Sequence, residues 1–253
     1  MKTLVRLADL NILISGLSIA GAQFFSRYSI SKGEPFVPDM HVDISSEDIE
    51  AEMHQCAETR LKPMNENRKD ESFKQECETL AVCRKISNKL CFEEGFLMHG
   101  SAFSYDGCGV MIIAPSGTGK STHSRMWREV YGEHVKMIND DKPFIRFDNK
   151  GVPFVYGTPW SGKHRLDSNT KAPLKAICVI EQAETDLIKP LELSDSLTCL
   201  IRQIHRPRKS IELVKTLHLT EKLGRCVKLY KLSCTPTHKA AKIANAKIFR
   251  EDS

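Results

Sequence analysis

The chain has 253 residues, with 37 basic and 32 acidic side chains and a formal net charge of +5 at pH 7. This length suits one large domain, or a small domain attached to a core. The sequence lacks the polybasic arm or interleaved aromatic residues of a nucleic-acid-binding protein, which argues against nucleic acid as a partner. Its nine cysteines form no CxxC pair and are odd in number, so zinc sites and a disulfide framework are both poorly supported. Reduced thiols are typical of a cytoplasmic protein.

The first residues imitate a secretory signal. Lys2 precedes an apolar stretch, but Arg6, Asp9 and Asn11 interrupt it, so the stretch is too broken to span a bilayer. The alternation across residues 10–14 predicts a strand instead, with export as the lesser alternative. We therefore expect no membrane partner.

Two helices are predicted before residue 94. A capping box over residues 45–48 opens a helix that ends near Leu61. Residues 62–72 are predicted to form a loop, and helical spacing from Phe73 predicts a second helix to about Leu90. We expect an N-terminal α/β region over residues 1–94, packed on a core over residues 95–253, and the two parts could share one sheet.

Three apolar segments are predicted to be strands of the core. Residues 96–98 lead into His99 and Gly100, residues 101–105 run into a tight turn, and residues 109–113 form a buried strand. The strand that carries His99 is then expected to pair with the strand over residues 109–113.

The segment after residue 113 is the most informative in the chain. Residues 114–122 read Ala-Pro-Ser-Gly-Thr-Gly-Lys-Ser-Thr, a Walker A phosphate loop in which Ala114 replaces the first glycine. A helix predicted over residues 122–131 follows, so strand, Gly-rich turn and helix stand in the required order. Lys120 would reach the β- and γ-phosphates and the Ser121 hydroxyl would bind Mg²⁺. The predicted phosphate-binding residues are Pro115, Ser116, Gly117, Thr118, Gly119, Lys120, Ser121 and Thr122. The alternative is a Gly/Ser turn that happens to precede a helix.

Two adjacent carboxylates, Asp140 and Asp141, end an apolar run that begins at Met137. Neighbouring residues of a strand point to opposite faces, so one carboxylate can face the phosphates, and at the end of the strand both can reach. An aspartate beside Mg²⁺ and a lysine stays ionised and can accept a hydroxyl proton during phosphoryl transfer. The alternative is a solvated turn after a strand.

Residues 157–163 contain glycines, a proline, Trp160 and Lys163, which excludes a regular helix or a central strand. Such a loop could cover a substrate through Trp160 and Lys163, or Trp160 could fill the core. The basic run over residues 202–209 is predicted to be a solvated helix end, with phosphate contact as the lesser hypothesis.

The remaining elements follow from turn residues and periodicity. They are a hairpin turn over 148–151, a strand over 176–180, a helix from Ser194 to about His205, a helix over 211–223, a strand over 227–233 and a terminal helix from Thr237 to near Arg250.

The ordered set of His99-Gly100, the turn over 106–109, the loop over 116–121 and Asp140-Asp141 resembles the core of HPr kinase/phosphorylase. Residues 122–127, 140–143 and 157–163 make the chain similar to the short HPr-kinase-like proteins of bacteria, some of which phosphorylate peptides or small alcohols. The resemblance covers residues 95–165. It implies an α/β fold with a PEP-carboxykinase-like P-loop core, a mixed sheet and flanking helices, and it implies ATP and Mg²⁺ as cofactors.

The resemblance also implies roles for single residues. Lys120 binds the phosphates, Ser121 ligates Mg²⁺, Asp141 accepts the proton of the attacking hydroxyl and His99 supports that carboxylate. The family's further Mg²⁺-ligating glutamate has no counterpart in residues 156–160, so Asp140 or water is expected to take its place. The family's C-terminal arginine motif has at best a faint counterpart in residues 205–208.

Together these features predict an ATP-dependent, Mg²⁺-assisted kinase whose acceptor is a peptide serine or a small alcohol, in a protein that could form a homo-oligomer. Three alternatives stay open. They are a carboxykinase-like lyase, a non-catalytic nucleotide sensor or maturation partner, and a nucleoside triphosphate hydrolase.

Overall fold

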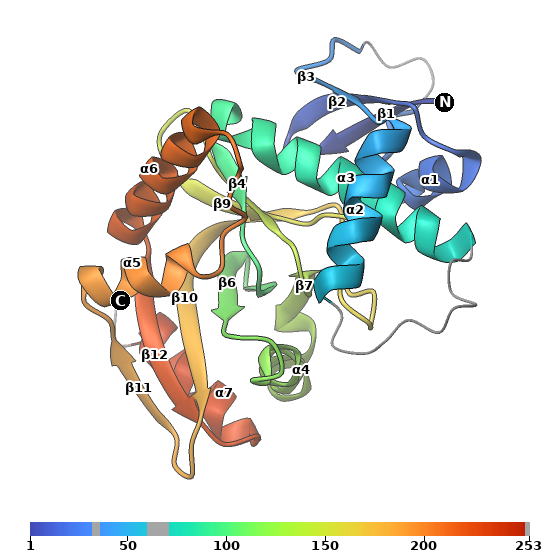
Figure 1. Ribbon diagram of the computed structural model, residues 1–253. Helices are drawn as coiled ribbons and strands as arrows, with labels where there is room; N and C mark the ends of the chain where they lie inside the picture. Colours follow the sequence, from blue (N-terminus) through green and yellow to red (C-terminus); the bar gives the residue numbers. More distant parts are fainter. Residues whose placement is uncertain (32–35, 60–70, 251–253) are drawn as a thin grey trace. The chain divides into compact units, whose positions relative to one another are not determined.

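The computed structural model describes residues 1–31, 36–59 and 71–250 (Figure 1). The chain divides into two compact units, Met1–Lys89 and Leu90–Ser253. Each unit has its own sheet, so the expectation that the two parts could share one sheet is wrong. No described helix combines the length and apolar character needed to cross a membrane.

The first unit contains a three-stranded sheet in the order β1-β2-β3. The first two strands form an antiparallel hairpin, and β3 pairs with β2 in parallel. The elements are β1 (Lys2–Leu7), β2 (Leu10–Ser15), α1 (Ile19–Phe24), β3 (Met40–Asp43), α2 (Ser46–Thr59) and α3 (Glu71–Leu90). The strand predicted over residues 10–14 is thus confirmed as β2.

The predicted capping box is present at the start of α2. The Asp48 backbone N–H donates to the Ser45 hydroxyl (3.3 Å), and the Ser45 backbone N–H donates to the Asp48 carboxylate (2.8 Å). This reciprocal pair satisfies backbone donors that a helix start leaves open. The predicted end of this helix at Leu61 lies outside the described residues, as does most of the loop predicted over 62–72.

The described residues of the second unit contain a nine-stranded mixed sheet in the order β4-β8-β9-β10-β6-β5-β7, with β12 beside β10 and β11 beside β12. The long strand β10 joins its two parts, because its start pairs with β9 and its remainder with β6 and β12. The strands are β4 (Gly95–Leu97), β5 (Ser101–Tyr105), β6 (Cys108–Ile113), β7 (Val135–Asn139), β8 (Phe144–Phe147), β9 (Pro153–Tyr156), β10 (Lys171–Gln182), β11 (Leu187–Pro190) and β12 (Lys228–Cys234).

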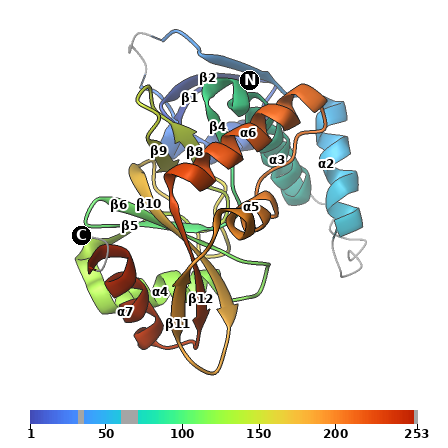
Figure 2. The same cartoon turned by 90° about the vertical axis from the view of Figure 1, so that its left-hand side faces the viewer.

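Helices cover both faces of this sheet (Figure 2). They are α4 (Lys120–Tyr131), α5 (Leu193–Ile201), α6 (Ser210–Cys226) and α7 (His238–Asn245). Within β6, Val110 and Ile112 pack in the cluster formed with α4 and α7, whereas Met111 and Ile113 pack in the cluster formed with α5 and α6. A strand buried on both faces is apolar at every position, which explains the uninterrupted apolar run before the loop. The predicted mixed sheet with flanking helices is confirmed.

Several boundary predictions differ from the structure. The short strand β4, which leads to His99, pairs with β8, and it is β5 that pairs with β6. The predicted pairing of the His99 strand with residues 109–113 is therefore wrong. Helix α5 begins after Glu192 and ends at Ile201 instead of near His205. By contrast, the predicted terminal helix from Thr237 to near Arg250 is confirmed, with its last five residues, Ala246–Arg250, in a π-helix.

Candidate active site

The loop between β6 and α4 is held open by two glycines. Gly117 and Gly119 have φ values of +81° and +116°, a left-handed region that residues with a side chain rarely adopt. A Cβ atom built on either glycine would meet no atom within 4 Å. These glycines are therefore needed for the backbone conformation, and the space above them stays open.

Helix α4 begins without a side-chain cap, because Gly119 occupies the N-cap position. The first N–H groups of a helix lack partners within the helix and carry a positive partial charge. Such a helix start, placed next to a glycine-rich loop, is suited to bind phosphate oxygens. The predicted order of strand, loop and helix is confirmed, with the helix starting at Lys120 rather than at Thr122.

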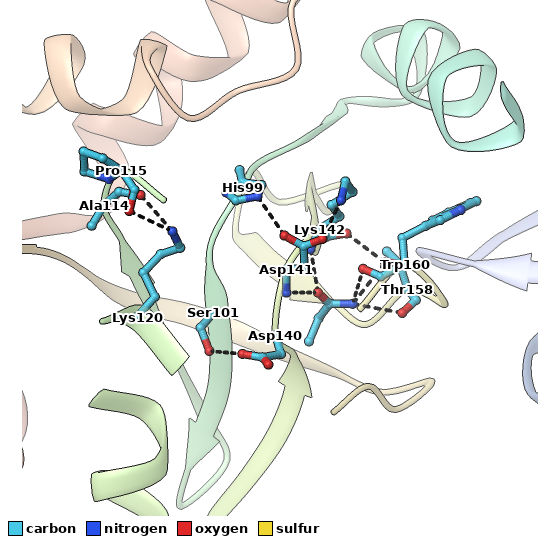
Figure 3. Close-up of polar contacts among 11 residues, drawn as sticks. His99, Ser101, Ala114, Pro115, Lys120, Asp140, Asp141, Lys142, Thr158 and Trp160 are labelled. Atoms are coloured by element: carbon cyan, nitrogen blue, oxygen red, sulfur yellow. Dashed lines mark hydrogen bonds and ion pairs between the residues drawn. The ribbon is translucent and has the colours of Figure 1, made fainter. Parts of the chain in front are cut away.

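The Lys120 side chain folds back onto the loop (Figure 3). Its ammonium group donates to the backbone carbonyls of Ala114 (2.9 Å) and Pro115 (3.2 Å), and the residue is only 9% exposed. Burial lowers the pKa of this ammonium group, while the negative charges of Asp141 and Asp140 act in the opposite direction. Both carboxylates thus lie within electrostatic reach of the lysine.

Asp141 is held between two basic side chains (Figure 3). Its Oδ1 atom lies 2.7 Å from Nε2 of His99, and its Oδ2 atom contacts the ammonium group of Lys142. Burial alone would raise the pKa of this carboxyl, but the hydrogen bonds and charges of His99 and Lys142 outweigh that effect and lower the pKa to about 2. Asp141 is therefore ionised at neutral pH, as a proton acceptor requires.

The lowered pKa of Asp141 predicts a pH-dependent contribution to stability. Because the folded-state pKa lies below the ordinary value of 3.8, the contribution is present above about pH 4 and is lost as the pH falls toward 2. Its size is roughly 2 kcal/mol. In urea unfolding at pH 6, the free energy of unfolding of the wild type is expected to exceed that of the Asp141→Asn variant by this amount. This difference should narrow steadily below pH 4. A gap that stays constant down to pH 3 would contradict the prediction.

Asp140 lies on the other side of the same turn and is 5% exposed. The Ser101 hydroxyl donates to Asp140 Oδ1 (3.2 Å) and lies 2.7 Å from the hydroxyl of Ser124 in α4. Ser121 precedes Ser124 by three residues, so it lies on the same face of α4, one turn closer to the loop. The structure thus places Asp140 beside the first turns of the helix that carries Ser121.

Asn139 organises the turn that carries both aspartates, a role that was not among the predicted ones. Its side-chain oxygen accepts the backbone N–H groups of Asp141 (2.8 Å) and Lys142 (2.7 Å). Its side-chain nitrogen donates to the carbonyls of Thr158 (2.9 Å) and Trp160 (3.3 Å). An asparagine at the end of a strand, directly before the aspartate pair, is the signal that could have revealed this role, because Asn side chains commonly bond the backbone two residues ahead.

Replacing Asn139 with alanine is expected to destabilise the protein by about 2–4 kcal/mol, because buried N–H and C=O groups would lose their partners. The expected loss is measured as the free energy of unfolding in urea. Asn149, an exposed residue of the β8–β9 turn, provides the matched control, since Asn149→Ala breaks no buried hydrogen bond of this kind. Equal effects of the two substitutions would contradict the assigned role of Asn139.

The loop over residues 157–163 packs against the aspartate turn. A Cβ atom on Gly157 would lie 1.7 Å from the Ser168 carbonyl oxygen, and one on Gly162 would lie 3.2 Å from Asp140 Oδ2. Glycine is therefore required at position 157 for close backbone approach. Trp160 is 4% exposed and lies against Phe144, with ring centroids 6.0 Å apart, so its side chain fills the core. Lys163, in contrast, is exposed.

The prediction that the basic run is a solvated helix end holds only in part. Arg202 is the exposed C-cap residue of α5 and Lys209 is the N-cap residue of α6, but residues 203–205 form a different structure. The His99 backbone N–H donates to the Gln203 carbonyl (2.7 Å), and the His205 backbone N–H donates to the Leu97 carbonyl (2.9 Å). Residues 203–205 thus extend the sheet beside the end of β4. This long-range pairing ends α5 early and brings Arg202 and His205 toward the loop.

The structure brings four of the predicted residues into one constellation, in which Asp141 contacts His99 and Lys120 interacts electrostatically with Asp140 and Asp141. Across the described residues there is no group of three or more His, Cys, Asp or Glu side chains able to hold a metal ion.

Comparisons with known proteins give similarities at the level of the fold and of the family. A search of curated proteins found none. Among solved structures, the HPr(Ser) kinase/phosphatase from Coxiella burnetii matches 59% of this chain and 91% of its own chain, at 11% identity and a TM-score of 0.34. At this identity and TM-score, the match transfers no site residue and no activity to this chain.

A family model described as SynChlorMet cassette protein ScmC matches residues 66–210. The match covers more than half of the chain and contains the phosphate loop, both aspartates and the loop over residues 157–163. The chain belongs to the ScmC family.

Proposed function

We propose that this protein is a kinase that transfers the terminal phosphoryl group of ATP to a hydroxyl group of a peptide serine or a small alcohol. The observation that carries the proposal is the ionised Asp141, held by His99 and Lys142 within electrostatic reach of Lys120 at the phosphate loop. The proposed chemistry rests on these side chains and not on the family assignment.

The transfer forms one bond and breaks one. The acceptor oxygen bonds to the γ-phosphorus, the bond from that phosphorus to the β,γ-bridging oxygen breaks, and the nucleoside diphosphate leaves with the electron pair. The proton of the acceptor hydroxyl goes to the Asp141 carboxylate. Because the transition state of phosphoryl transfer is loose, the hydroxyl loses its proton late, and a weakly basic carboxylate is sufficient.

Lys120 and the loop supply positive potential. In the structure, the lysine ammonium group donates to two carbonyls of the loop, those of Ala114 and Pro115. Phosphate oxygens are stronger acceptors for a charged donor than neutral carbonyls, so a bound triphosphate would draw the ammonium group toward itself. The lysine and the N–H groups at the start of α4 would then neutralise charge on the β- and γ-phosphates.

The residues present fit a magnesium ion. Mg²⁺ is held in nucleotide sites by one or two protein oxygens together with phosphate oxygens and water. Asp140 offers a buried carboxylate whose one described hydrogen bond comes from Ser101, and Ser121 offers a hydroxyl on the adjacent helix. These two residues would hold the ion, which would neutralise negative charge on the phosphates and orient them.

The proposal is tested by incubating the purified protein with γ-labelled ATP, Mg²⁺ and a panel of serine peptides and small alcohols. Label is expected on an acceptor with the wild type and with Lys136→Ala, a substitution of an exposed lysine in β7, but not with Lys120→Ala. Labelled inorganic phosphate formed equally well without any acceptor would indicate a hydrolase. Nucleotide binding without release or transfer of label would indicate a sensor. Either the hydrolase result or the sensor result would overturn the proposal.

A further inference from the structure

A pocket of about 490 Å³ adjoins the proposed active site. It is lined by the end of β4 with His99, by the first residues of the phosphate loop, Pro115 and Ser116, and by residues 202–205. His99 is also the residue that contacts Asp141. The pocket is thus lined both by the partner of the proposed proton acceptor and by the phosphate loop, which suits it to receive an acceptor molecule.

The wall made by residues 203–205 is fixed by backbone pairing. Met98 and Ile204 form an antiparallel bridge, flanked by the hydrogen bonds that His99 and His205 donate to the facing carbonyls. Directly opposed residues of such a pair point to the same face, and neighbours point to opposite faces. Met98 and Ile204 are buried in the core, so His99 and His205 share the opposite face.

The charge of this wall favours an anion. Arg202 is exposed at the pocket, His205 is a second basic side chain, and none of the described residues that line the pocket is acidic. An arginine presents two parallel N–H donors that match the two oxygens of a carboxylate. Because Arg202 is exposed and His99 contacts Asp141, the pocket suits a ligand long enough to reach from Asp141 to Arg202.

We propose that this pocket binds the acceptor as a peptide in which the reactive serine has an acidic neighbour, and that Arg202 pairs with the carboxylate of that neighbour. This inference rests on the proposed kinase function and names its substrate class. The pocket volume lies in the range of sites that enclose a small ligand. A pocket of this size can take the side chains of a short peptide segment, but not a folded domain.

The test compares two matched acetylated tripeptides, Ala-Ser-Asp and Ala-Ser-Asn. Each is also made in reversed order, so that the acidic or amide residue precedes the serine, and free L-serine is included. Binding is measured by calorimetry on the protein loaded with Mg²⁺ and a non-hydrolysable ATP analogue, and transfer is measured with γ-labelled ATP. The acidic peptides are expected to bind about tenfold more tightly than the amide peptides, since a hydrogen-bonded charge pair is stronger than a neutral one. Arg202→Gln should remove this preference.

Arg206 provides the matched control, because it is an exposed arginine of the same segment that does not line the pocket. Arg206→Gln should keep the preference for the acidic peptide, and Arg202→Gln should leave the affinity for the ATP analogue unchanged. Equal binding of acidic and amide peptides, equal effects of the two arginine substitutions, or tighter binding of free serine than of the peptides would each overturn the inference.

The two measurements separate this inference from the proposed function. Preferential binding of the acidic peptide through Arg202 without transfer of label would support the pocket assignment and overturn the kinase. Transfer of label to acidic and amide peptides at equal rates would support the kinase and overturn the pocket assignment. Absence of both binding and transfer would overturn both.

Discussion

Asp141→Asn is expected to reduce phosphoryl transfer by about 10³–10⁴-fold, near the upper end of the range for removal of a general base. Asparagine preserves the shape of the side chain but cannot accept the hydroxyl proton. It also removes the negative charge that lies between His99 and Lys142. Binding of Mg²⁺ and ATP should be nearly unchanged, because the loop and the start of α4 remain intact.

The measurement is single-turnover transfer from labelled ATP, combined with calorimetric titration of nucleotide. Asp106→Asn is the matched control, since Asp106 forms a second Asp–His pair, with His134 at 2.7 Å, on an exposed turn. It should transfer phosphate at the wild-type rate. If Asp141→Asn retained full transfer, the assignment of Asp141 as proton acceptor would be wrong.

Lys120→Ala is expected to reduce transfer by about 10²–10³-fold, the size found when one preorganised electrostatic donor is removed from an active site. It should also weaken nucleotide binding, in contrast to Asp141→Asn, because the ammonium group is assigned to the phosphates in both the ground state and the transition state. The substitution further leaves the carbonyls of Ala114 and Pro115 without this donor.

Calorimetric titration with Mg²⁺ and ATP, followed by initial rates at saturating nucleotide, separates the two effects. Lys136→Ala, in an exposed position of β7, controls for the loss of one positive charge. Lys120→Ala with wild-type nucleotide affinity would show that the lysine stays on its loop carbonyls and does not bind phosphate.

The sequence predicted the parts of the site that depend on local chemistry. The loop over residues 114–122 carries its signal in the glycines, and both relevant glycines indeed have positive φ values. The aspartate pair follows an apolar run, and the structure places it at the end of β7. These features could be predicted because a turn or a strand end is determined mainly by its own few residues.

Other features depend on contacts between distant segments and could not be predicted from local patterns. The early end of α5 results from the pairing of residues 203–205 with residues 97–99, and such tertiary pairing overrides helix propensity. For the same reason the pairing of β4 with β8 was missed. The local bonds of Asn139 could have been expected, but its bonds to the carbonyls of Thr158 and Trp160, about twenty residues ahead, could not.

The contact between His99 and Asp141 was expected only from the resemblance to HPr kinase/phosphorylase, since no spacing rule joins residues so far apart. Trp160 shows the opposite case. The same resemblance favoured a substrate loop, but the side chain is buried against Phe144. A large aromatic residue buried to this degree contributes to core packing. Truncating it would therefore lower the stability of the fold rather than substrate binding alone.

The central claim is tested most directly by a crystal structure of the protein with Mg²⁺ and a non-hydrolysable ATP analogue. We expect the β- and γ-phosphates to lie in the loop over residues 115–122, with the Lys120 ammonium group moved from the carbonyls of Ala114 and Pro115 onto phosphate oxygens. The Asp141 carboxylate should face the γ-phosphate. A nucleotide bound elsewhere, or a carboxylate turned away from the phosphates, would contradict the proposed mechanism.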